Sequence, residues 1–263
     1  MAGPRRGAPG AAGTHVSAAL LLPLLGFASL ATSFVSGILG MAGGMILLGI
    51  LLAVLPLSTA MTLHGITQFA ANGGRAFMLR REVDWRIAGG YAVGALVALA
   101  LFALARIVLS KPHALIAMGL TPFVGLALPE RLHLNVERRG HSFACGLVCV
   151  ALALTAGIAG PILDLFFVRS RMPRHAVVAT KAITQTMTHL LKIVYFAALV
   201  GSITSLAEPV LAATMVILAF VGTSLSKRVL ERMTDASFRA WTRWTVMSLG
   251  AVYLIGGIRG LAA

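Results

Sequence analysis

Long apolar runs, separated by short polar or basic segments, fill this chain from residue 16 to its end. Most runs come close to the roughly 20 residues that an α-helix needs to cross a bilayer. None shows the period-two alternation that is typical of membrane strands. Because only helices and closed barrels satisfy their backbone in hydrocarbon, the pattern predicts an all-α integral membrane protein. We expect about eight transmembrane helices, at residues 17–55 with an interruption, 58–79, 87–109, 112–128, 142–168 with an interruption, 176–200, 209–226 and 244–258.

Two of these runs are interrupted by glycine. The first interruption begins at Gly40 and ends at Gly44, and the second begins at Gly157 and ends at Pro161. Glycine weakens a helix and lets another backbone approach, so both stretches predict broken or re-entrant segments. A helix that begins inside the membrane directs its free N–H groups at whatever lies ahead, which suits an anion, although close helix crossing explains the same glycines equally well. The anion interpretation places three glycines in a binding site: Gly43, Gly44 and Gly160.

Two polar stripes repeat along the chain at a constant offset of 117 residues, which takes His64 to Lys181. At 100° per residue the members of each stripe fall within roughly 80° of one another, on one face of one helix. A polar and cationic stripe inside a membrane is costly, so we expect both stripes to face a shared cavity. The first stripe consists of His64, Gln68, Asn72 and Arg75, the second of Lys181, Gln185, His189 and Lys192, and Ile66-Thr67-Gln68 recurs as Ile183-Thr184-Gln185.

The repeat divides the chain into two transmembrane halves, residues 16–128 and 142–263, joined by a polar linker at 129–141. Arg80 and Arg81 follow the first stripe, whereas the arginines from Arg169 to Arg174 precede the second. Under the positive-inside rule the two stripe helices therefore run in opposite directions, which favours the inverted repeat of secondary transporters. We expect residues 1–15, rich in Gly, Ala and Pro, to form a disordered cytoplasmic N-terminus.

Composition supports the membrane interpretation and narrows the chemistry. Hydrophobic residues make up 58% of the chain and charged residues only 11%, against about 25% charged in soluble domains. The net charge of +14 does not indicate a nucleic-acid partner, because the basic residues lie mostly in short loops and no basic stripe interleaved with aromatics occurs. Cys145 and Cys149 share one apolar span, where we expect two buried thiols rather than a metal site. We expect neither a metal nor a cofactor.

The motifs resemble those of the sulfite exporter TauE/SafE family over roughly residues 25–260. The resemblance rests on the glycine-rich breaks, the small polar motif in the following helix, the duplication, and Val83-Asp84-Trp85-Arg86 before a Gly/Ala-rich span. Many members have Gly-Thr-Ser where this chain has His64-Gly65-Ile66-Thr67-Gln68. The resemblance implies export of a small sulfur oxyanion or organosulfonate across the plasma membrane, which is the inner membrane in a bacterium.

Three cations of the stripes are the main candidates for binding an anion. A lysine near the middle of an apolar helix costs about 2.5–3.5 kcal/mol on insertion scales, so a partner must offset it. For Lys181 that partner is either the transported anion or Asp164, an acid within a second-half span. Lys192 and Arg75 lie nearer their helix ends, where snorkelling to the interface is the alternative.

The uncharged candidate residues also have purely structural interpretations. Gln68 and Gln185 can each donate two hydrogen bonds to an anion or link helices. Thr67 and Thr184 can bind the substrate or bond back to their own helices. His64 and Asn72 complete the first stripe as candidate ligands. Imidazole titrates near neutral pH, so His189 is a candidate for proton coupling. The carboxylate of Asp164 is a second candidate.

We therefore expect a secondary transporter that moves a small anion by alternating access, and proton coupling is an open option. A passive anion channel, a non-transporting scaffold and an intramembrane enzyme are the alternatives. The sequence contains no HExxH or GxSxG motif, which argues against the enzyme. The sequence leaves the oligomeric state and the coupling ion open.

Overall fold

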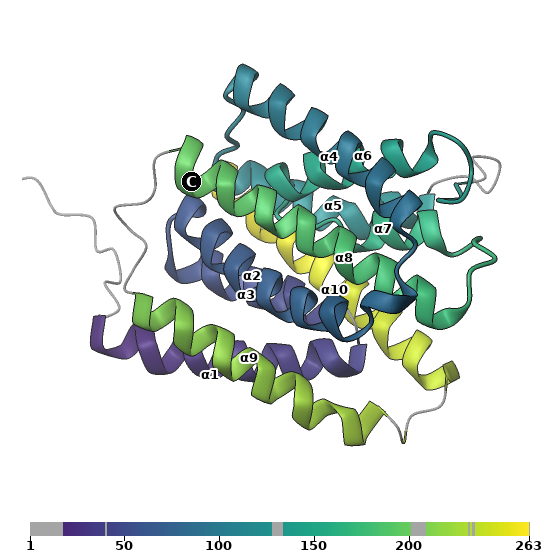
Figure 1. Cartoon of the computed structure of the whole chain (residues 1–263). Helices are drawn as coiled ribbons and strands as arrows, with labels where there is room; N and C mark the ends of the chain where they lie inside the picture. Colours follow the sequence, from purple (N-terminus) through teal and green to yellow (C-terminus); the bar gives the residue numbers. More distant parts are fainter. Residues whose placement is uncertain are drawn as a thin grey trace, which may run out of the picture.

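A computed structural model describes residues 18–39, 41–127, 134–200, 209–230, 232 and 235–262, and these form helices with no strand among them (Figure 1). The prediction of an all-α fold is confirmed. The helices are α1 (Ala18–Leu39), α2 (Ala42–Val54), α3 (Leu57–Met78), η1 (Arg80–Glu82), α4 (Trp85–Ala105), α5 (Lys111–Ala127), α6 (His141–Thr155), α7 (Gly160–Phe167), α8 (Arg174–Ile193), η3 (Val194–Leu199), α9 (Pro209–Leu230) and α10 (Asp235–Ala262).

Four described helices are long and apolar enough to cross a membrane. They contain the segments Leu20–Leu39, Trp85–Ala105, Pro209–Ser226 and Ala240–Ala262. α3 and α8 are about as long, but their polar stripes lower their hydropathy. The count of about eight spans stays a prediction.

Both predicted breaks interrupt helices. α1 ends at Leu39 and α2 begins at Ala42, while α6 ends at Thr155 and α7 begins at Gly160; Gly40 lies outside the described residues. α2 packs back along α1, where a Cβ atom on Gly43 would lie 2.0 Å from the Thr32 carbonyl oxygen. Gly157 has φ +75°, a left-handed conformation that glycine adopts without strain. The two breaks meet, because a Cβ atom on Gly160 would lie 2.8 Å from Met41 Sδ.

The helices of the two halves pack in matching pairs. α1 packs on α9 as α6 packs on α4, while α3 packs on α8 and α5 on α10. α3 and α8 are antiparallel: His64 contacts Lys192, and the backbone N–H of Asp84, beyond the end of α3, donates to Thr180 near the start of α8. α6 begins at His141, so residues 134–140 of the expected linker lie outside the helices. The division into two halves, with its boundaries, stays a prediction.

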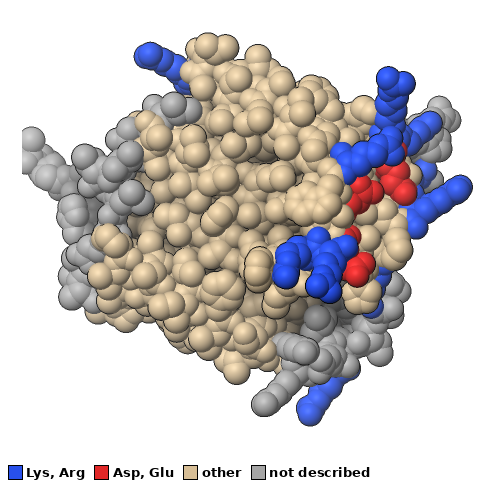
Figure 2. All heavy atoms as spheres, viewed as in Figure 1, with Lys and Arg blue, Asp and Glu red and all other residues tan. Residues whose placement is uncertain are grey.

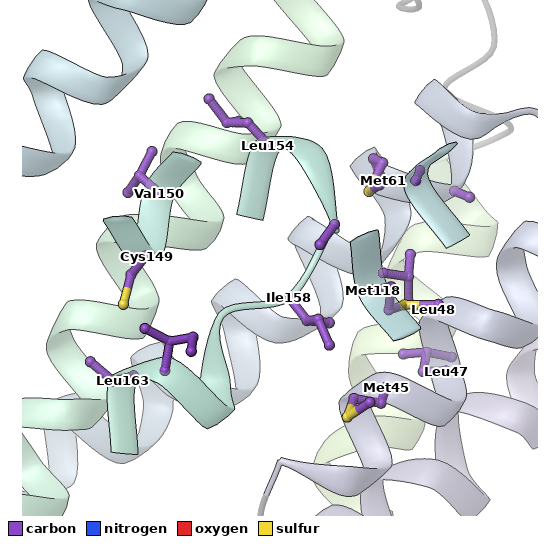
Figure 3. Packing of buried hydrophobic residues seen from close by; sticks show 14 of the residues in the cluster. Met45, Leu47, Leu48, Met61, Met118, Cys149, Val150, Leu154, Ile158 and Leu163 are labelled. Atoms are coloured by element: carbon purple, nitrogen blue, oxygen red, sulfur yellow. The ribbon is translucent and has the colours of Figure 1, made fainter. Parts of the chain in front are cut away.

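Apolar residues of both halves form one core around the breaks (Figure 3). Leu48 and Met61 from the first half lie against Gly157. Cys145 and Cys149 are fully buried free thiols in this core, with their sulfurs 3.9 Å apart. The breaks are therefore held by close packing on their apolar side, which leaves their other side for polar residues.

Charged side chains gather mainly at one end of the face seen in Figure 2, next to a broad band without Lys, Arg, Asp or Glu. Arg80 and Arg81 follow α3, and Arg171 and Arg174 precede the antiparallel α8, so these arginines share that end. α1 begins at the opposite end and runs toward the arginines (Figure 1). Large apolar side chains such as Leu104, 84% exposed, face outward as lipid contact requires.

Candidate functional site

A cavity of about 310 Å³ lies between the stripe helices and the two breaks. Residues of the last turns of α1 and α3 and of the first turns of α8 line its outer part, so it leads inward from the arginine-rich end. Seven of the eight stripe residues line this cavity, and Lys192 is the exception. The structure brings ten predicted site residues to its wall: Gly44, His64, Gln68, Asn72, Arg75, Gly160, Asp164, Lys181, Gln185 and His189.

Arg75, in the last turn of α3, brings its guanidinium to the wall of this cavity. Its half-buried guanidinium has no hydrogen bond or ion pair with any residue in the described part of the chain. The side-chain amides of Gln68 and Gln185, on the same wall, are likewise without protein partners there. A guanidinium and two amides offer several N–H donors to the oxygens of an anion, which is the chemistry of an oxyanion site.

Lys181 makes an ion pair with Asp164. Its ammonium donates to a carboxylate oxygen of that residue, and both side chains line the cavity. The alternative that the sequence left open for Lys181 is therefore the one the structure contains. The pair leaves Arg75 as the cavity-lining cation without an acidic partner among the described residues.

Lys192 does not line the cavity but lies behind it, with 0% of its side chain exposed. The alternative that Lys192 snorkels to the interface is therefore wrong, and its predicted role in substrate binding stays a prediction. Its Nζ is 2.9 Å from both the Gly157 carbonyl oxygen and His64 Nδ1, and His64 Nε2 is 3.0 Å from the Gly44 carbonyl oxygen. Since an ammonium group only donates, His64 accepts at Nδ1 and donates from Nε2. This network ties one break to the other.

His189 lies beside this network, with its ring 5.5 Å from that of His64. Its Nδ1 is buried and has no hydrogen-bond partner in the described structure. An unsatisfied buried nitrogen is costly and often marks a functional group or an unseen ligand. His189 is thus a stripe residue with a fully buried nitrogen that the described structure leaves unsatisfied.

Four predicted residues take no direct part in the cavity wall, and Lys192 is one of them. Thr67 and Thr184 bond back to the carbonyl oxygens of Leu63 and Lys181 on their own helices, the structural role that the sequence also allowed. Gly43 packs against α1 instead of facing the cavity. Asn72 lines the cavity, but its amide donates to the Gln68 carbonyl oxygen.

Four hydroxyl residues of the wall escaped prediction: Ser33 and Ser36 on α1, Thr223 on α9 and Thr242 on α10. They lie outside the repeated stripes and the glycine breaks, which were the two main signals for the other wall residues. A pair of serines three apart on one helical face of an apolar run was the available sign for α1.

The described residues contain no group of three or more His, Cys, Asp or Glu side chains that could hold a metal ion. The donors that face the cavity are nitrogen-rich and cationic, so they fit an anion better than a cation.

Long apolar helices around a polar, cationic cavity define an integral membrane protein with the architecture of a transporter. The family model described as Sulfite exporter TauE/SafE matches residues 25–253, and the chain belongs to that family. The resemblance stated from the motifs is confirmed. Membership implies a membrane exporter of sulfite or another sulfur compound. Comparisons with curated proteins and with solved structures gave no significant match.

Proposed function

We propose that this protein exports a small sulfur oxyanion or organosulfonate by alternating access, with the anion bound in the cavity at the helix breaks. The observation that carries the proposal is Arg75, a cation without a protein partner in the described structure, on the wall of that cavity. Gln68 and Gln185 add neutral N–H donors from the two halves. Gly44 and Gly160, near the starts of α2 and α7, would bring backbone N–H groups and favourable helix dipoles.

An inverted repeat would supply the two states that alternating access needs. The antiparallel packing of α3 on α8 supports such a repeat. So do the matching pairs in which helices of one predicted half pack on helices of the other. The cavity leads inward from the arginine-rich end, which the positive-inside rule assigns to the cytoplasm. We infer that the structure corresponds to an inward-facing state, in which the Lys192–His64 network closes the path to the other side.

Coupling to protons is part of the proposal. His189, whose buried Nδ1 lacks a partner in the described structure, is the first candidate for the proton site, and Asp164 is the second. A proton bound at His189 would add positive charge next to the cavity and favour anion binding. A proton and an anion that bind together would cross in the same direction, so an imposed pH gradient should change the rate of anion flux.

Flux through the purified protein in liposomes tests the proposal. Uptake of labelled sulfite is compared with uptake of sulfate, a sulfonate and a cation, each with and without a pH gradient. We expect saturable anion flux, counter-flow between labelled and unlabelled anion, and a response to the gradient. Flux that does not saturate and shows no counter-flow would indicate a channel. Absence of anion flux through folded protein would refute the proposal.

A further inference from the structure

The ion pair between Lys181 on α8 and Asp164 on α7 is accessible, unlike the buried Lys192. Its side chains are 27% and 41% exposed. A partly exposed pair between flexible side chains contributes little net stability, because water competes for both groups. Replacing Asp164 with another anion as the partner of Lys181 therefore costs little free energy.

Asp164 lies on a wall between two hollows. A second hollow, of about 350 Å³, lies between α5, α7 and α10 and shares Met41, Pro161, Asp164 and Thr242 with the central cavity. Lys181, by contrast, lines the central cavity but not the second hollow. The carboxylate can thus leave the ammonium by turning toward the second hollow without entering the core, while Lys181 stays at the cavity.

The pair belongs to one half of the repeat. At the offset of 117 residues, Leu47 and His64 occupy the positions of Asp164 and Lys181. Leu47 is fully buried, and His64 is held by Gly44 and Lys192. The first half therefore has no exchangeable ion pair at these positions, so the pair is not required by the repeated fold.

We propose that Asp164 competes with the transported anion for Lys181. With no anion present, the carboxylate neutralises Lys181, and Arg75 alone attracts the substrate. When an oxyanion enters, Lys181 exchanges Asp164 for it, and the anion is then held between two cations. The return of Asp164 to Lys181 displaces the anion and speeds its release. This inference rests on the proposed function of the same cavity.

Competition makes opposite predictions for the two partners. Asp164→Asn removes the competing charge, so sulfite binds more tightly, with a roughly fivefold lower Kd, while turnover slows because release is slower. Lys181→Met removes the contested cation, so sulfite binds more weakly. In the double variant, Asp164→Asn no longer tightens binding, because the two residues act through one contact.

Binding of sulfite to purified protein by calorimetry, together with flux in liposomes, tests the proposal on wild type, both single variants and the double variant. Asp164→Ser is a second neutral variant if Asp164→Asn does not fold. Unchanged or weaker binding in the neutral variants, or tightening that persists with Lys181→Met, would overturn the competition while wild-type flux upheld the transport proposal. Wild-type protein that neither binds nor moves any anion would overturn both.

Discussion

Three cations of similar sequence context differ at the residue scale in what surrounds them. Arg75 faces the cavity without a protein partner in the described structure, Lys181 is paired with Asp164, and Lys192 is buried against a carbonyl and an imidazole. A cation with no acceptor is available to a ligand, whereas one that is fully hydrogen-bonded is structural. The three residues therefore call for different experiments.

Arg75→Gln should weaken sulfite binding by about tenfold or more, because a hydrogen bond to a charged group contributes about 1.5–3 kcal/mol. Arg75→Lys should restore part of the affinity, since it keeps the charge but loses the planar donor fork. Calorimetric binding and liposome flux measure the effect. Arg80→Gln is the control, because Arg80 is exposed, donates to the Phe77 carbonyl oxygen and stacks on the Phe77 ring. Equal losses in the two glutamine variants would exclude a specific role for Arg75.

Lys192→Met should lower the free energy of unfolding by about 1–3 kcal/mol, because His64 Nδ1 and the Gly157 carbonyl oxygen lose their buried donor. Thermal unfolding in detergent measures the loss. Lys111→Met, at the start of α5, is the matched control, because its amine makes no such bonds in the described structure. An unfolding midpoint that matches wild type would contradict the structural role of Lys192.

At the element scale the first break contains two adjacent glycines with different tasks. A Cβ atom on Gly43 would lie 2.0 Å from the Thr32 carbonyl oxygen and 2.5 Å from the Ser36 backbone nitrogen. A Cβ atom on Gly44 would lie 3.3 Å from the amide nitrogen of Gln68, a flexible side chain. The first glycine lets α2 fold back on α1, and the second leaves room at the cavity.

Gly43→Ala should therefore reduce the yield of folded, monodisperse protein, because the backbones of α1 and α2 must separate. Gly44→Ala should fold normally and lower the rate of transport by displacing Gln68. Size-exclusion chromatography followed by flux in liposomes distinguishes the two variants. Wild-type yield and unfolding temperature for Gly43→Ala would show that the packing of α2 on α1 does not depend on this close approach.

At the scale of the whole molecule, the direction of α1 bears on topology. α1 runs toward the arginine-rich end (Figures 1 and 2), so a cytoplasmic N-terminus and cytoplasmic arginine loops exclude each other. Arg80, Arg81, Arg171 and Arg174 outweigh the two arginines at positions 5 and 6, and the positive-inside rule follows the larger bias. The cytoplasmic N-terminus stays a prediction, and the positive-inside rule applied to the arginine loops predicts that α1 begins on the opposite side.

Labelling of intact cells with a membrane-impermeant maleimide decides the topology. Ser110→Cys, beyond α4, should react from outside, and Arg81→Cys should react only after the cells are permeabilised. An epitope placed before residue 1 should be accessible from outside, as Ser110→Cys is. The native Cys145 and Cys149 are fully buried and should stay unlabelled. Reaction of Arg81→Cys in intact cells would reverse the assignment and make the N-terminus cytoplasmic.

Much of the fold followed from local patterns. Apolar run length predicted helices, glycine clusters predicted the breaks, and the repeated stripes predicted a shared cavity, because each depends on residues close together in one segment. The stripes identified seven residues of the cavity wall by their periodicity, and the glycine breaks identified two more. Ser33, Ser36, Thr223 and Thr242 were missed because they come from helices outside the stripes, which only packing brings to the site.

The sequence by itself determined that this is a helical membrane protein with a polar interior, since hydropathy and periodicity are properties of single segments. Its two related halves stay a prediction. Only the tertiary structure decided which of the three stripe cations lacks a protein partner within the described residues. Lys192 meets a carbonyl 35 positions away and an imidazole 128 positions away, and Lys181 meets Asp164 on another helix. Availability for a ligand depends on such distant partners, because a charge is neutralised by what lies next to it in space.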